Sequence, residues 1–123
     1  MEGRDDVAPS PAALPAELDL VLVNAPPEKA DAIARALVEQ RLVACVNVVP
    51  RVKSVYRWQG KVEEAEESTL LMKTRRSLVP ALTTAVKLLH PYEVPEIIAL
   101  PIATDRGNTD YLAWVVAETS RGD

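Results

Sequence analysis

The stretch His90–Glu96, with the sequence HPYEVPE, contains two of the ten prolines and the only histidine of this 123-residue chain. Proline has no N–H to donate to a helix or a sheet ladder, and it restricts the residue before it. The stretch therefore predicts a rigid polar corner between a helix that ends near His90 and a buried strand over residues 96–102. Polar side chains held on such a corner are the best candidates for function in this sequence.

The segments before and after the corner have the periodicity of strands and helices. Residues 17–25 are nearly continuously apolar, which favours a strand that is covered on both faces. Two prolines at 26 and 27 suit the first turn of a helix, and apolar residues then recur at the helical spacing. A second helix is predicted to begin with Ser77 as its N-cap, and a short C-terminal helix is predicted to begin at Thr109 or Asp110.

A long hairpin is predicted between the first two helices. An apolar run over residues 42–49 is interrupted by Pro50 and resumes up to Trp58, and a proline inside a strand indicates an edge or a bulge. Gln59 and Gly60 form the turn, and the return strand covers residues 62–74. A long strand edge invites pairing with another chain, so we expect an oligomer.

The predicted order of elements defines an α+β fold. It is β-α-β-β-α-β with a short C-terminal helix, which is the ferredoxin-like arrangement. At this length we expect a single domain over residues 17–119, preceded by a disordered Pro/Ala-rich tail (1–16) and followed by a frayed end (120–123).

Composition excludes several classes of function. The formal net charge of −4 does not attract nucleic acid or an anionic membrane, and the apolar runs are shorter than the roughly 20 residues of a membrane span. The single cysteine, Cys45, excludes an intrachain disulfide, and we expect a cytoplasmic location. With one histidine and no Ser/His/Asp set, nucleophilic catalysis has little support.

Five short motifs, in order and similarly spaced, resemble those of the CutA divalent-cation tolerance proteins. They are ACVN (44–47), WQGKVE (58–63), MKTR (72–75), HPYEVPE (90–96) and DYLAW (110–114). The resemblance extends over residues 18–116. It implies a ferredoxin-like fold assembled as a tight homotrimer, in which the long hairpin pairs with neighbouring subunits. It also implies an association with copper, Cu(II), and other divalent cations, no organic cofactor, and no established catalytic activity.

The candidate metal ligands are few. Some members of the family place a cysteine late in the first strand and a pair of histidines before the corner. In this chain Val23 takes the place of the cysteine and Leu89 that of the first histidine, so only His90 remains of that set. His90 can ligate a divalent metal with oxygen from Glu93 or Glu96, or it can instead cap the end of its helix. Cys45 is a further weak candidate, although a free cysteine in an apolar run is usually a small buried hydrophobe.

Two further clusters have both a binding and a purely structural interpretation. The acidic cluster of the hairpin (Glu63, Glu64, Glu66, Glu67) can bind a hard cation or simply form a solvated edge that discourages mispairing. A cleft for a small anion or a planar ligand is predicted from aromatic and basic residues, whose cations can equally pair with the glutamates. The cleft residues are Trp58, Lys73, Arg75, Tyr92, Tyr111 and Trp114. The leading hypothesis is a non-enzymatic, cation-binding trimer, and the alternative is a trimeric small-ligand or signalling module that uses this cleft between subunits.

Overall fold

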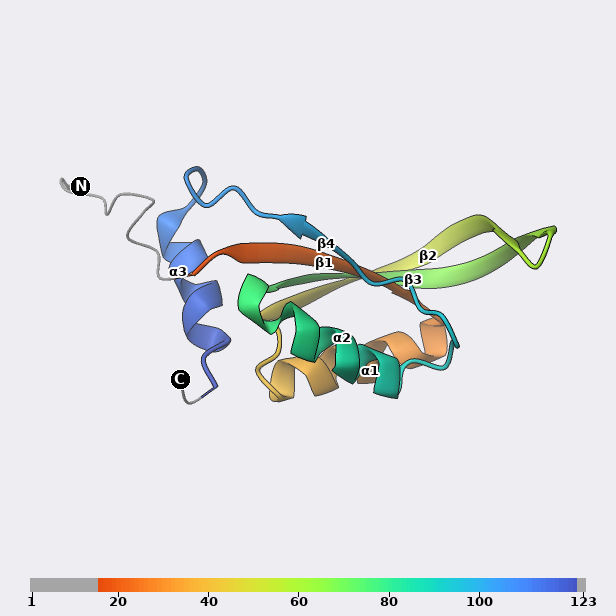
Figure 1. The fold of residues 1–123 in the computed structure, drawn as a ribbon, viewed down its shortest axis with the longest axis horizontal. Coiled ribbons are helices and arrows are strands. Elements are labelled where there is room, and N and C mark those ends of the chain that lie inside the picture. The colour runs from red at the N-terminus through yellow and green to blue at the C-terminus, as the bar shows by residue number, and fades with distance from the viewer. Residues whose placement is uncertain (1–15, 122–123) are drawn as a thin grey trace.

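The structure, a computed structural model, describes residues 16–121. Nearly all of the predicted tail and residues 122–123 of the predicted frayed end lie outside the described residues. The elements are β1 (Leu18–Ala25), α1 (Pro27–Glu39), β2 (Cys45–Trp58), β3 (Lys61–Arg75), α2 (Val79–Leu89), β4 (Ile98–Pro101) and α3 (Thr109–Glu118), shown in Figure 1. A single 3-10 turn, η2 (Arg76–Leu78), joins β3 to α2.

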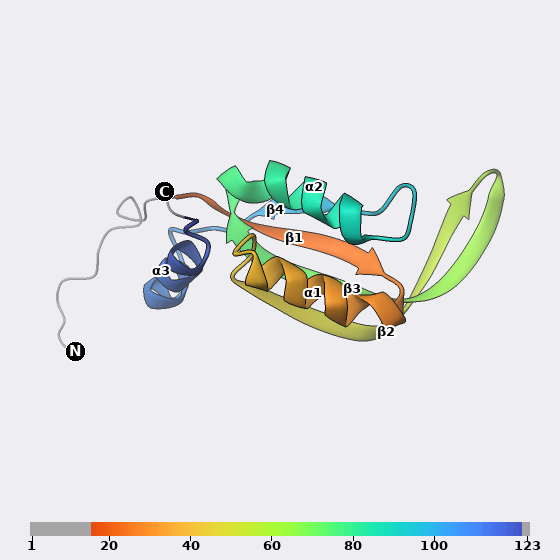
Figure 2. The ribbon, with the colours of Figure 1, turned by 90° about the horizontal axis from the view of Figure 1, so that it is seen from below.

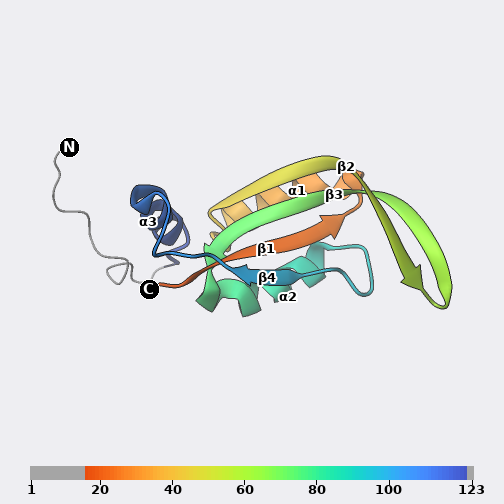
Figure 3. The ribbon, with the colours of Figure 1, turned by 90° about the horizontal axis from the view of Figure 1, so that it is seen from above.

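The four strands form one antiparallel sheet in the order β2-β3-β1-β4. This arrangement confirms the predicted α+β order β-α-β-β-α-β. Helices α1 and α2 cover one face of the sheet (Figure 2), whereas within residues 16–121 no helix lies over the opposite face (Figure 3). Helix α3 packs at the end of the sheet where β1 begins, through a small cluster that includes Leu18 and Val115.

The core lies between the sheet and the two helices. Alternate residues of the central strands, such as Val21 and Met72, point to the helices because side chains alternate between the faces of a strand. The apolar stripes of α1 and α2 contact these strand residues through side chains such as Leu37 and Leu82. All four of the side chains named here are fully buried. Each such side chain contributes roughly 1.5–3 kcal/mol of hydrophobic stabilisation. The burial therefore fixes the register of β1 and β3.

The face of the sheet without helices also carries a group of apolar side chains. We call it the open face, and its members follow from the strand register because residues directly opposite each other lie on the same side. Two of its residues on the edge strand β4, Ile98 and Leu100, are 51% and 44% exposed. The apolar members of the open face are Leu20, Leu22, Val49, Leu71, Ile98 and Leu100, and the same register places Asn24, Asn47, Thr69 and Lys73 on this face.

The hairpin of β2 and β3 extends past the helices (Figure 1), as the sequence predicted. Its turn has positive φ at Gln59 and Gly60 (50° and 81°), which is the type I′ conformation that matches the twist of paired strands. The ladder shifts register between Val49 and Val52, next to the proline at position 50, so the predicted bulge is confirmed.

The structure corrects several predicted boundaries. The N-cap of α2 is Leu78, not Ser77, because η2 has already turned the backbone before the helix begins. The N-cap of α3 is Asn108, whose side chain accepts hydrogen bonds from two backbone N–H groups of the first turn, so Thr109 and Asp110 lie inside the helix. Residues 42–44 are buried but precede β2, and β4 is shorter than the predicted strand over residues 96–102. No helix within residues 16–121 has the length and apolar character needed to cross a membrane.

Candidate functional site

His90 connects the end of α2 to the end of β1. It is the C-cap of α2 and only 6% exposed. Its Nδ1 accepts a hydrogen bond from the backbone N–H of Tyr92 at 3.1 Å, so the proton of the neutral ring is on Nε2. Nε2 then donates to the backbone carbonyl of Asn24 at 2.7 Å. Both ring nitrogens are therefore used within the protein, and a metal ion at His90 would have to displace one of these hydrogen bonds.

Tyr92 continues this network to the hairpin. Its ring lies 4.7 Å from the ring of His90, centroid to centroid, and its hydroxyl donates to Oε2 of Glu67 at 2.8 Å. The Ser54 hydroxyl donates to the other oxygen of Glu67 at 2.6 Å. Glu67 is 5% exposed, and a buried carboxylate needs such donors to offset the loss of water. Burial and the bonded Glu67 carboxylate raise the pKa of Tyr92 to about 12.

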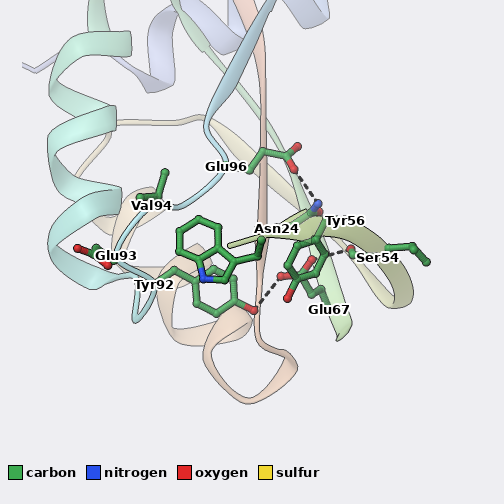
Figure 4. Close-up of a pocket in the computed structure, with 10 residues that line it drawn as sticks. Asn24, Ser54, Tyr56, Glu67, Tyr92, Glu93, Val94 and Glu96 are labelled. Carbon is green, nitrogen blue, oxygen red and sulfur yellow. Dashed lines mark hydrogen bonds between the residues drawn. The ribbon is translucent and has the colours of Figure 1, made fainter. Parts of the chain in front are cut away.

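A cavity of about 550 Å³ lies between the hairpin and the corner. Figure 4 shows the carboxylates of Glu67 and Glu96 on the same side of the Tyr92 ring, with dashed lines marking the hydrogen bonds. The walls of the cavity come from the end of β1, from both strands of the hairpin and from the corner. The lining residues are Asn24, Ser54, Val55, Tyr56, Trp58, Glu67, Tyr92, Glu93, Val94 and Glu96.

The predicted metal ligands do not meet in one place. Glu93 and Glu96 both line the cavity, and Glu96 accepts a hydrogen bond from the Asn24 side chain at 3.0 Å. In the strand register, Cys45 of β2 lies opposite Lys73 of β3. The His90 ring bonds to Asn24 of β1, which lies opposite Thr69 of β3. Thr69 and Lys73 are four positions apart on β3, or about 13 Å along the strand. Within residues 16–121, no three His, Cys, Asp or Glu side chains are grouped to hold a metal ion.

The predicted aromatic and basic cleft is divided within one chain. Trp58 and Tyr92 line the cavity, whereas Lys73 lies beside Cys45 and hydrogen-bonds to the Asn47 side chain. The Arg75 guanidinium donates to the Thr119 carbonyl.

The C-terminal aromatic residues belong to the Lys73 end of the sheet. The Tyr111 and Trp114 rings of α3 lie 5.5 Å apart, and burial together with the neighbouring Cys45 raises the pKa of Tyr111. A cleft that unites them with Trp58 would need a second subunit.

Sequence reasoning missed the roles of three residues that build the cavity. Asn24 was predicted only as the end of a strand, and its side chain instead joins Glu96 to Thr69 of β3. Glu67 was counted with the solvated glutamates, and Ser54 was not singled out. One signal in the sequence is the position of Glu67, which is the last acidic residue before the apolar half of its strand begins. A carboxylate at that boundary is placed to enter the protein interior.

Replacing Tyr92 with phenylalanine should change how stability depends on alkaline pH. The neutral phenol is favoured in the folded protein. Its contribution to the free energy of unfolding is therefore complete below the ordinary pKa of about 10 and is lost as the pH rises toward the folded-state pKa of about 12. The free energy of unfolding, measured in urea from about pH 9 to about pH 12, should therefore fall more steeply for the wild type than for Tyr92→Phe. Parallel curves for the two proteins would contradict the assignment.

Comparison with known proteins gives a consistent result. A sequence model described as CutA1 divalent ion tolerance protein matches residues 19–118. The chain is 48% identical to human Protein CutA over 120 residues, which cover 92% of this chain and 66% of the human protein. It is 54% identical to the divalent-cation tolerance protein CutA of Thermus thermophilus over 102 residues, which cover 82% of this chain and 97% of that protein. The chain thus spans just under two thirds of the human relative and nearly the whole of the bacterial one.

Solved structures of such proteins have the same fold. The structure of the Thermus thermophilus protein superimposes with a TM-score of 0.80 at 53% identity, covering 84% of this chain and 99% of that one. A structure titled PII-like protein CutA, from a Nostoc species, superimposes with a TM-score of 0.79 at 39% identity and covers 83% of this chain and 97% of its own. The sequence match, the sheet order and these superpositions agree, and the chain belongs to the CutA1 divalent ion tolerance protein family.

Proposed function

We propose that this protein is a non-enzymatic homotrimer that acts in the tolerance of divalent cations and binds copper and other divalent cations weakly. The family supplies the connection to divalent cations. Catalysis is not part of the proposal because the only histidine has both ring nitrogens engaged in structural hydrogen bonds. A cytoplasmic location stays a prediction.

The observation that supports the proposed trimer is the open face together with the free edges of the sheet. Its apolar side chains, among them Ile98 and Leu100, have no covering layer in the part of the chain that the structure describes. Strands β2 and β4 form the two edges, and each offers unpaired backbone N–H and C=O groups to another chain. An exposed apolar surface flanked by open edges is typical of a subunit interface. A closed ring of three copies would satisfy both features.

Weak rather than tight cation binding follows from the metal-ligand groups that the structure offers. Three glutamates of the hairpin, Glu63, Glu64 and Glu66, are exposed to solvent, and Glu64 forms an ion pair with Lys53 at 3.4 Å, which partly neutralises it. Glu93 and Glu96 are separate from any sulfur or free imidazole donor. A tight zinc or copper site requires three or four such ligands in defined geometry, so these carboxylates support only exchangeable binding.

Calorimetric titration of chelator-treated protein with Cu(II) and Zn(II) should give a small, salt-sensitive heat without a stoichiometric endpoint. Exposed carboxylate sites lose most of their attraction for cations as salt screens the charges. Cys45→Ser should bind as the wild type does, because Cys45 lies apart from the acidic residues. A sharp one-to-one endpoint that disappears in His90→Gln would overturn the weak-binding proposal and place a metal at the corner.

A second candidate function, a small-ligand or signalling module, is supported by the cavity. Its volume of about 550 Å³ is within the range of about 300–1,000 Å³ that is usual for small-molecule sites. The Nostoc relative is described as PII-like, which connects its fold to that of another protein class without naming a ligand. In this second candidate the cavity of each subunit binds the ligand, and the trimer brings three such sites together.

A further inference from the structure

We propose that the cavity binds a small organic cation, that is, an ammonium group attached to an apolar body. This inference rests on the small-ligand function proposed above and specifies its ligand class. It follows from two properties of the lining taken together, its charge and its exposed apolar surface.

The lining has acidic residues and no basic ones. Three carboxylates, those of Glu67, Glu93 and Glu96, face or border the cavity, and none of its described lining residues is Lys, Arg or His. The Glu67 oxygens already accept hydrogen bonds from Ser54 and Tyr92, so Glu67 supplies a fixed negative charge. Walls of low polarity strengthen the field of such a charge inside a concave site.

Glu96 is a lining carboxylate with capacity left for a ligand. Only its Oε1 has a partner among the described residues, the side chain of Asn24. Figure 4 shows the Glu96 carboxylate well apart from the Tyr92–Glu67 hydrogen bond. Its second oxygen can therefore accept a hydrogen bond or an ion pair from a bound cation. A charge-assisted bond of this kind is about twice as strong as a neutral one.

The same cavity also has aromatic and aliphatic walls that remain partly exposed. Tyr56, Trp58 and Tyr92 are each 40–45% exposed, and Val55 and Val94 are more exposed still. The face of an aromatic ring attracts a cation within about 6 Å of its centroid. A ligand that is both positively charged and apolar would satisfy the carboxylates and cover these side chains at once.

Other ligand classes fit less well. An anion would be repelled by three carboxylates. A hard divalent cation would use the carboxylates but would keep much of its water, and would leave the aromatic walls uncovered. A neutral apolar molecule would cover the walls but leave the negative charge of Glu96 without a partner. The organic cation is the class that uses every part of the lining.

Titration of the full-length protein with three matched probes tests the inference. Trp114→Phe leaves Trp58 as the only tryptophan, so that intrinsic fluorescence reports on the cavity. Benzylammonium should change this fluorescence saturably, at a half-saturating concentration at least about tenfold below that of benzyl alcohol, which has the same shape without the charge. Mg²⁺ is the third probe and has charge without an apolar body.

A pair of variants locates the effect. In the same background, Glu96→Gln keeps an oxygen for the Asn24 bond and should raise the half-saturating concentration of benzylammonium about tenfold. Glu64→Gln makes the same change of charge outside the cavity lining. It should leave the half-saturating concentration of benzylammonium unchanged.

The possible failures are distinguishable. Equal responses to benzylammonium and benzyl alcohol would overturn the cation class and leave the ligand-binding function in place. A response to Mg²⁺ alone would overturn both and favour the weak metal binding of the first proposal. No response to any probe would overturn both the inference and the ligand-binding function. If Glu96→Gln and Glu64→Gln weakened the binding of benzylammonium equally, binding would depend only on the net charge of the protein. That result would also overturn the inference.

Discussion

Replacing Ile98 with aspartate should convert the assembled protein into monomers that remain folded. Ile98 is 51% exposed in the single chain and lies on the edge strand of the open face, opposite Leu22 of β1. In the proposed trimer this side chain is buried against neighbouring subunits. An aspartate there would carry a charge into an apolar interface without a partner, which costs several kcal/mol per copy after relaxation, on the order of 3–5. Light scattering at micromolar concentration should then give one third of the wild-type mass.

The control is the same substitution on the opposite side of the molecule. Leu88 of α2 is 83% exposed on the outer surface of the helix layer, so Leu88→Asp should leave the mass of the assembly unchanged. Circular dichroism of both variants should match the wild type, because neither side chain belongs to the core. A wild-type protein of monomeric mass, or an Ile98→Asp variant that remains trimeric, would contradict the proposed interface.

Most of the fold could be predicted from the sequence because its signals are local and strong. Continuous apolar residues marked β1, helical spacing marked α1, and Pro50 with Gly60 marked the bulge and the turn of the hairpin. The errors were at the starts of α2 and α3, at the start of β2 and in the length of β4. Ser77 and Asn108 are both plausible caps by residue type, and the backbone turn that precedes each helix decides which residue occupies the cap.

The candidate site was predictable only as a set of residue types. The corner was correctly expected to follow a helix that ends near His90, and the structure places Tyr92, Glu93 and Glu96 on one cavity. Their partners could not be read from the sequence, because Asn24 and Glu67 are 66 and 25 positions away from the groups they bind, His90 and Tyr92. Spacing in a sequence carries no information about such contacts. The division of the aromatic residues between two ends of the sheet has the same cause.

His90→Ala should be the most destabilising single change at the corner. It would leave the Tyr92 N–H and the Asn24 carbonyl without their partner in a site where His90 is only 6% exposed, and it would remove a buried ring. Two lost hydrogen bonds with buried ends, plus the space left by the ring, should lower the free energy of unfolding by about 2–4 kcal/mol. Urea denaturation of wild type and variant at one protein concentration measures this loss, since assembly also shifts apparent stability.

Two conservative variants separate the hydrogen bonds from the packing of the ring. The oxygen of an asparagine can replace Nδ1 and accept the Tyr92 N–H, whereas the amide nitrogen of a glutamine can replace Nε2 and donate to Asn24. His90→Asn and His90→Gln should therefore each recover about 1 kcal/mol of the loss seen in His90→Ala. Recovery by both would establish the ring as a structural link between α2, β1 and the cavity wall. If all three variants were as stable as the wild type, the ring would be free to exchange these bonds for a metal ion, and the argument against a metal at the corner would fail.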